Sequence, residues 1–234
     1  MARFDTVEVG GSAMRICVAA PAGAGPHPAI IVMCHISGLD AFTEDRVDRL
    51  AAAGYVAAAP DIFHYHDWIE DRDERRATLR DTRVLADIEA GLAHIDKTGS
   101  VDANRTAILG HCMGGRTAML GAGSIPRFGP LVDYYGGNTM KSWGDDQGPT
   151  PFERIPNIRG PVIGFFGLLD GNPSPADVDK IEAEFGRAGI ACEFHRYEGA
   201  DHAFQNFTNP ERHHPDAAGD SWEKTLRFLG ENLA

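Results

Sequence analysis

Apolar stretches of strand length alternate with helical patterns along the chain, and this alternation limits the fold more than any other feature. Residues 29–34 read Ala-Ile-Ile-Val-Met-Cys, a run typical of a strand covered on both faces. Further strands are predicted at 55–59, 105–109, 131–135, 161–166 and 191–197. Helices are predicted at 43–53, 79–97, 114–121, 175–188 and 217–233. The charged segment 67–83 is expected to pass from an exposed loop into the helix 79–97, with most of its charges on a solvated face. This β–α–β–α order predicts an α/β fold, with a parallel-majority sheet and helices on both faces.

The N-terminal segment departs from the alternation. Residues 4–9 and 13–19 flank Gly10-Gly11 and are typical of a β-hairpin. We therefore expect a twisted sheet of about seven or eight strands with an antiparallel N-terminal edge. Residues 1–234 are predicted to form one domain. Residues 136–159, rich in Gly, Pro, Asp and Asn, are expected to be an irregular loop or partial cap near a site.

The negative net charge argues against two classes of partner. The chain carries 22 Lys and Arg against 34 Asp and Glu, a formal net charge of −12. Nucleic acids and membrane surfaces are polyanionic, so neither is an expected partner, although one local Arg could hold a small anion. The N-terminus lacks an apolar signal region, and apolar runs fall short of the roughly 20 residues of a membrane span. These features predict a cytoplasmic protein that is a monomer or a small homo-oligomer.

The most informative local pattern is Gly110-His111-Cys112-Met113-Gly114, between a predicted strand and a predicted helix. A Gly-x-Cys-x-Gly turn at this point is typical of a nucleophile elbow with Cys in place of Ser. The nucleophile of such a turn sits on strained backbone, so its neighbours two residues away must be small. A helix N-terminus also favours the thiolate form of Cys112. The alternative is a glycine-rich turn with a buried Cys, as expected for the other three cysteines.

Two other strand ends carry matching partners. Asp170 follows the strand 161–166, and His202 follows the strand 191–197. The order nucleophile, acid, histidine is the order found in α/β-hydrolases. Asp177 and Asp179 are weaker candidates because they lie on the next predicted helix. We therefore predict that Cys112 attacks an ester carbonyl, that His202 transfers protons and that Asp170 orients the imidazole. The backbone N–H groups of Ile36 and Met113 are the predicted oxyanion donors.

These residues resemble the dienelactone hydrolase family of the α/β-hydrolase superfamily. The similar segments are Gly-His-Cys-Met-Gly-Gly at 110–115, Ala-Gly-Tyr-Val-Ala-Ala-Ala-Pro-Asp at 53–61, Asp-Tyr-Tyr-Gly at 133–136 and Gly-Ala-Asp-His-Ala-Phe at 199–204. The resemblance covers nearly the whole chain. It implies an α/β-hydrolase fold, hydrolysis of an enol lactone such as dienelactone (carboxymethylenebutenolide) and no cofactor.

The sequence departs from the family pattern where the substrate is bound. The family has a Glu after the third strand that switches the Cys towards thiolate, and His35 stands in its place. The family's substrate Arg after the catalytic His is absent from Phe204-Gln205-Asn206. The candidate substrate contacts are therefore His35, Arg80, Arg83 and Phe204. His35 either assists the reaction as an electrophile or fills a polar niche.

Other functions stay open at this point. A general carboxylesterase or thioesterase could use the same three residues, and a catalytically silent ligand-binding protein could share the fold. The His64, His66 and Asp67 cluster could in principle bind a metal. Nothing else in the sequence completes a ligand set, so no metal is predicted and a pocket wall is the favoured role for this cluster.

Overall fold

The computed structural model describes residues 1–144 and 148–234. Its strands are β1 (Arg3–Val9), β2 (Ser12–Ala19), β3 (His27–Met33), β4 (Val56–Pro60), β5 (Val101–His111), β6 (Leu131–Tyr134), β7 (Val162–Gly167) and β8 (Cys192–Tyr197). The helices are α1 (Ala41–Ala52), α2 (Arg72–Ala77), α3 (Asp81–Asp96), α4 (Met113–Ala122), α5 (Pro175–Arg187) and α6 (Pro215–Asn232). Two short 3-10 helices, η1 (His64–His66) and η2 (Ile155–Asn157), complete the described elements.

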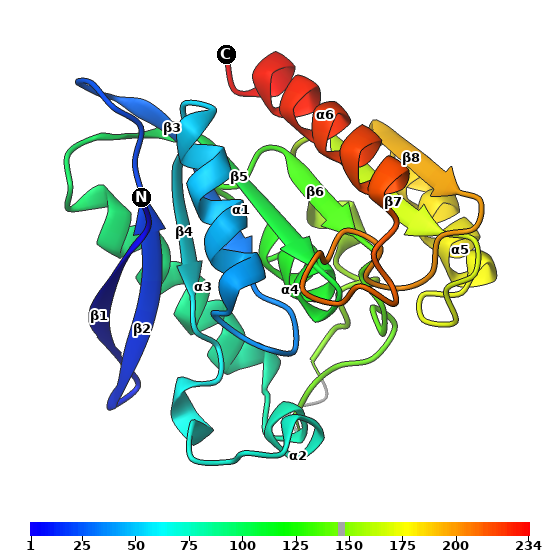
Figure 1. Ribbon diagram of the computed structural model, residues 1–234, viewed down its shortest axis with the longest axis horizontal. Coiled ribbons are helices and arrows are strands. Elements are labelled where there is room, and N and C mark those ends of the chain that lie inside the picture. Colours follow the sequence, from blue (N-terminus) through cyan, green and yellow to red (C-terminus); the bar gives the residue numbers. More distant parts are fainter. Residues whose placement is uncertain (145–147) are drawn as a thin grey trace.

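All the described strands join one eight-stranded sheet with the order β1-β2-β4-β3-β5-β6-β7-β8. The β1–β2 and β2–β4 pairs are antiparallel, and every pair from β4–β3 to β7–β8 is parallel (Figure 1). The predicted parallel-majority sheet with an antiparallel N-terminal edge is therefore confirmed. The prediction that residues 1–234 form one domain stays a prediction.

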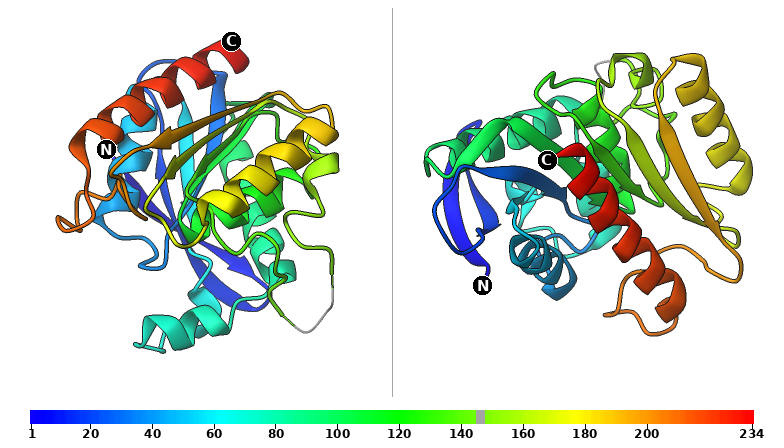
Figure 2. Two further views of the ribbon diagram at one scale, coloured as in Figure 1. Left: turned by 90° about the vertical axis from the view of Figure 1, so that its right-hand side faces the viewer. Right: turned by 90° about the horizontal axis from the view of Figure 1, so that it is seen from above.

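Helices cover both faces of the sheet (Figure 2). Each face has its own core of buried side chains. Ile31 and Met33 of β3 pack with side chains of α3, α4 and α5 on one face. Ile30 and Val32, the alternate residues, pack with α1 and α6 on the other. Because successive side chains of a strand point to opposite faces, one continuous apolar run supplies both cores.

One predicted element is wrong at its start. The segment 67–83 was expected to be an exposed loop that leads into a single helix over 79–97, but it contains the separate helix α2. The Asp71 carboxylate caps α2 by accepting hydrogen bonds from the backbone N–H groups of Asp73 and Glu74. Arg80 then adopts an extended conformation (φ −133°, ψ 133°), so α3 begins only at Asp81.

The loops at the carboxyl edge of the parallel strands include the irregular segment 136–159. Apart from η2, residues 136–144 and 148–159 form no helix or strand, as predicted, and residues 145–147 lie outside the described residues. Among the described helices, none combines the length and apolar character that a membrane span requires. In parallel α/β sheets this carboxyl edge is where ligands bind.

Candidate active site

Cys112 occupies a tight turn between β5 and α4. Its backbone has φ 59° and ψ −123°, and its N–H donates to the carbonyl of Tyr134 over 2.9 Å. A Cβ on Gly110 would collide with the Gly114 carbonyl, and a Cβ on Gly114 would collide with the backbone of β3. Only glycine allows the approach that this turn needs, which explains the Gly-x-Cys-x-Gly spacing.

Three side chains from three strand ends meet at this turn. The Nε2 atom of His202 lies 2.9 Å from Cys112 Sγ. The Nδ1 atom of the same ring lies 2.7 Å from Asp170 Oδ2. The other carboxylate oxygen of Asp170 accepts the backbone N–H of Asn172 over 2.7 Å. The structure therefore brings together the three residues that the sequence singled out, in the order Cys–His–Asp.

The surroundings of His202 stabilise its protonated form. Burial lowers the pKa of the ring, but the hydrogen bonds to Asp170 and Cys112 and the nearby negative charge outweigh it and raise the pKa to about 10. The side chain of Asp170 is only 2% exposed, so water screens its charge poorly. A proton can therefore reside on His202 at neutral pH, opposite a sulfur atom that can carry negative charge.

Two cavities open on either side of this group, and both are lined by Ile36, Cys112 and His202. The first, here called the Trp143 cavity, has a volume of about 360 Å³ and is also lined by Arg76, Met113, Asn138, Trp143 and Asn172. The second, here called the His35 cavity, has a volume of about 590 Å³ and is also lined by His35, Ser37, Phe42, Tyr135 and Asn206. A substrate can thus extend in two directions from the sulfur atom.

Backbone strain is concentrated around these cavities. In the described part of the chain, the non-glycine residues with positive φ are Cys112 (59°), Tyr135 (44°), Asn138 (55°) and Ala203 (63°). Each of the four lines one or both cavities. Strained conformations persist only where the surrounding structure holds them, and they gather at functional sites.

The predicted oxyanion donors and His35 lie at the site. Ile36 and Met113 line the Trp143 cavity beside Cys112. His35 lines the other cavity, is 8% exposed and places its Nε2 atom 2.9 Å from Asp40 Oδ2. The ring also contacts Phe42 edge-on. His35 is thus a polar wall residue of the second cavity with a carboxylate partner.

The other three predicted substrate contacts lie elsewhere. Arg80 and Arg83 line a separate hollow of about 10 Å³. Arg80 donates to the carbonyls of Ala77 and Leu79, while Arg83 contacts His66 and the ring of Tyr65. Phe204 is fully buried. Neither cavity that contains Cys112 includes these three side chains in its described lining.

Two residues that line the Trp143 cavity, Arg76 and Trp143 itself, were not predicted from the sequence. Arg76 belongs to the charged segment that was interpreted as a solvated face, and α2 carries it to the cavity. Trp143 is held by Arg116, whose guanidinium carbon lies 3.7 Å from the centre of the indole ring. Arg116 also pairs with Asp81 at 2.7 Å, and Asp81 accepts the backbone N–H of Trp143. Arg116 is the one charged residue of the helix that follows the elbow, and it was the available signal for a buried ion pair at this site.

The histidine cluster after β4 lies away from the Cys112 cavities. His64 is buried, with its Nε2 atom 3.0 Å from Asp87 Oδ1. His66 lines the small hollow beside Arg83. Within the ranges 1–144 and 148–234, no three His, Cys, Asp or Glu side chains are grouped as metal ligands. The favoured role of a substrate-pocket wall does not fit the placement of His64 and His66.

Known proteins are similar to this chain in sequence and in fold. The model of the dienelactone hydrolase family matches residues 14–233. A Synechocystis protein named "Putative carboxymethylenebutenolidase" is 29% identical over 92% of this chain and 91% of its own length. A Bradyrhizobium protein named "Probable 2-oxo-3-(5-oxofuran-2-ylidene)propanoate lactonase" is 31% identical over 98% of this chain and 95% of its own. A crystal structure titled "Putative Dienelactone Hydrolase", from Klebsiella pneumoniae, is 27% identical and superposes with a TM-score of 0.88 over 98% of both chains.

Proposed function

The chain belongs to the dienelactone hydrolase family and is a hydrolase of esters or lactones, and we propose that Cys112, His202 and Asp170 carry out its reaction. The observation that carries this proposal is the position of the His202 ring, with one nitrogen 2.9 Å from a sulfur and the other 2.7 Å from a buried carboxylate. This is the arrangement in which a histidine moves protons for a nucleophile.

The first half of the proposed reaction forms a thioester. The Cys112 thiol gives its proton to His202 Nε2, and the sulfur then attacks the carbonyl carbon of the substrate. The C–S bond forms while the carbonyl electrons move to oxygen, where the backbone N–H groups of Ile36 and Met113 stabilise the negative charge. When the carbonyl re-forms, the bond to the leaving oxygen breaks and His202 returns its proton to that oxygen.

The second half consumes one water molecule. His202 takes a proton from water, and the hydroxide attacks the thioester carbon. The C–S bond breaks, the acid leaves, and Cys112 and His202 return to their initial state. Asp170 keeps the Nδ1 proton of His202 directed at its own carboxylate throughout, so that Nε2 faces the sulfur and the reacting oxygens. For a lactone the leaving oxygen stays attached to the same molecule, and the product is a hydroxy or oxo acid.

We propose that the Trp143 cavity receives a flat, anionic lactone. Trp143 offers an aromatic wall, Arg76 a positive charge, and Asn138 and Asn172 two polar amides. The indole is held by the buried Arg116, so the wall is preformed. The Bradyrhizobium relative is named for a propanoate that carries an unsaturated five-membered lactone, which has this chemistry. Arg76 would bind the carboxylate of such a substrate.

A neutral ester is the second candidate substrate. The larger His35 cavity is lined by one residue of each charge, Arg72 and Glu211, so its lining carries no net charge from Arg and Glu. Asn206, which also lines it, lies in the segment where the family has an Arg. Arg76 is 46% exposed and already pairs with Asp73, so it attracts a carboxylate less than a buried Arg would. An ester with a large, uncharged alcohol group would fit these two features.

The two candidates separate in one assay series. Purified protein is tested with cis- and trans-dienelactone and with p-nitrophenyl acetate, beside Cys112→Ala and Arg76→Met. Loss of all turnover in Cys112→Ala supports the proposed nucleophile, and wild-type rates in that variant would refute it. If the substrate is anionic, Arg76→Met raises KM for dienelactone by about 10-fold and leaves p-nitrophenyl acetate unchanged. Turnover of the neutral ester alone would favour the second candidate.

A further inference from the structure

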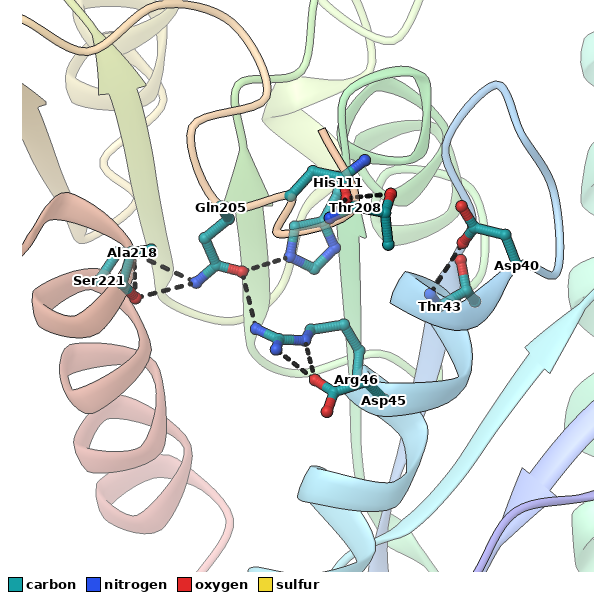
Figure 3. A network of polar contacts seen from close by, with 10 residues as sticks. Asp40, Thr43, Asp45, Arg46, His111, Gln205, Thr208, Ala218 and Ser221 are labelled. Carbon is teal, nitrogen blue, oxygen red and sulfur yellow. Dashed lines mark hydrogen bonds and ion pairs between the residues drawn. The ribbon is translucent and has the colours of Figure 1, made fainter. Parts of the chain in front are cut away.

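A buried hydrogen-bond network joins the turn that carries Cys112 to the loop that carries His202 (Figure 3). Gln205 is its centre. The side-chain oxygen Oε1 of Gln205 lies 3.0 Å from His111 Nε2 and 3.1 Å from Arg46 Nη1. Gln205 and His111 are 2% exposed and Arg46 is 4% exposed. Such contacts in a low-dielectric interior are strong when every partner is satisfied.

Arg46 determines the orientation of the Gln205 amide and therefore which groups donate and which accept in this network. A guanidinium group can only donate hydrogen bonds, so the Gln205 oxygen must face it. The amide nitrogen of Gln205 then donates to Ser221 Oγ at 3.2 Å. His111 must carry its proton on Nε2 to donate to the same oxygen of Gln205. Burial, and then the charge of Arg46, lower the pKa of His111 well below 6.5, which keeps its ring neutral.

The network spans the two halves of the catalytic group. His111 immediately precedes Cys112, and Gln205 comes three residues after His202. Residues 198–214 between β8 and α6 contain no helix or strand. Isolated backbone hydrogen bonds, such as those from Leu169 to Ala200 and from His214 to Phe204, and side-chain contacts hold this loop in place. Figure 3 shows the Gln205 side chain reaching from the loop to the strand end, to α1 and to α6. Arg46 belongs to α1 and Ser221 to α6.

We propose that Gln205 is a positioning residue for the hydrolysis: through His111 and Arg46 it holds the His202 loop over the Cys112 turn. It touches neither cavity in the described lining, so it acts through His202 and not on the substrate. This inference rests on the proposed roles of Cys112 and His202. A displacement of a reacting group by about 1 Å can cost roughly 100-fold in rate, so the loss of this tether should be visible in catalysis.

The test compares Gln205→Leu with His111→Phe and with their combination. Leucine fills a similar volume without the acceptor, and phenylalanine keeps the stacking of His111 on Tyr134 without the donor. Each single variant should lower kcat for p-nitrophenyl acetate by roughly 10- to 100-fold with KM nearly unchanged. The double variant should lose no more than Gln205→Leu alone, because Gln205→Leu already removes the hydrogen bond between Gln205 and His111.

The pH profile separates positioning from general destabilisation. If His202 is less firmly held against Cys112 and Asp170, its pKa falls below about 10, so the alkaline limb of kcat/KM should move to lower pH in both variants. Thr106→Val is the matched control. It removes a buried hydroxyl of β5 that contacts Ala103 and Arg127, away from Gln205, and it should lower Tm but leave kcat and the limb unchanged.

Gln205→Glu supplies a rescue. A carboxylate still accepts from Arg46 and His111, so this variant should recover most of the kcat that Gln205→Leu loses. If Gln205→Leu does not fold, kcat and the pH profile are compared between His111→Phe, Gln205→Glu and the wild type instead. Wild-type kcat and an unmoved alkaline limb in folded Gln205→Leu or His111→Phe would overturn the inference. Full activity in Cys112→Ala would instead overturn the proposed function on which it rests.

Discussion

Replacing Asp170 with Asn changes one atom of a side chain whose two oxygens are both engaged. Oδ2 accepts from His202 Nδ1 at 2.7 Å, and Oδ1 accepts from the backbone N–H of Asn172 at 2.7 Å. An asparagine can keep the second bond only if its NH2 group faces His202. Two donors then meet, unless the imidazole moves its proton to Nε2, where it blocks acceptance of the Cys112 proton.

The size of the loss follows from the contact. A hydrogen bond to a charged group contributes about 1.5–3 kcal/mol, which corresponds to roughly 10- to 150-fold in kcat/KM. The wrong tautomer of His202 adds to this loss, so about 100-fold is the minimum expected for the whole change. The substitution also removes the larger of the two hydrogen bonds that raise the pKa of His202 to about 10. The alkaline limb of the rate profile should therefore move to lower pH.

The assay is the pH dependence of kcat/KM for p-nitrophenyl acetate, measured with Asp170→Asn, Asp177→Asn and Asp201→Asn. Asp177 contacts Ser174 and Lys180, and Asp201 accepts the backbone N–H of His202 over 2.6 Å. Neither carboxylate reaches the imidazole nitrogens in the described contacts, so both controls should stay within about threefold of wild type. An Asp170→Asn rate within threefold of wild type, with its alkaline limb unmoved, would refute the assignment of Asp170.

Three further outcomes concern stability and are measured by thermal unfolding. Gly114→Ala should lower Tm and abolish activity, because the added Cβ collides with the backbone of β3. Gly219→Ala is the control: its added Cβ lies in open space on α6, and it should stabilise the protein by up to about 1 kcal/mol. Burial raises the pKa of the Asp133 carboxyl from 3.8 to about 7, so between these two pH values the folded state keeps a proton that the unfolded state has released. The stability of the wild type should therefore fall as the pH rises from 3.8 to about 7. A pH profile of stability identical to that of Asp133→Asn would contradict this. Arg116→Leu should cost about 3–5 kcal/mol because it leaves the partner carboxylate buried and unpaired; a loss below 1 kcal/mol would show that the ion pair is dispensable.

The sequence alone was sufficient to predict the sheet and the meeting of Cys112, Asp170 and His202 at one edge of it, for local reasons. Gly110 and Gly114 are required by the turn itself, since each approaches backbone atoms too closely for any side chain. Asp170 and His202 follow strands whose apolar runs are unambiguous, and parallel strands end at one edge. Residues that follow such strands are therefore brought near one another by the topology, before any side-chain contact is considered.

The tertiary structure decided which charged residues line the cavities beside Cys112. The sequence pattern of 67–97 does not reveal that the helix breaks between Ala77 and Asp81, and the break decides which arginine reaches the cavity. Asp81 pairs with the buried Arg116, 35 residues further along the chain, and this contact holds the start of α3. Arg76 consequently lines the Trp143 cavity, while Arg80 and Arg83 line a separate hollow. Such a choice depends on a contact between distant segments, and local propensity carries no information about it.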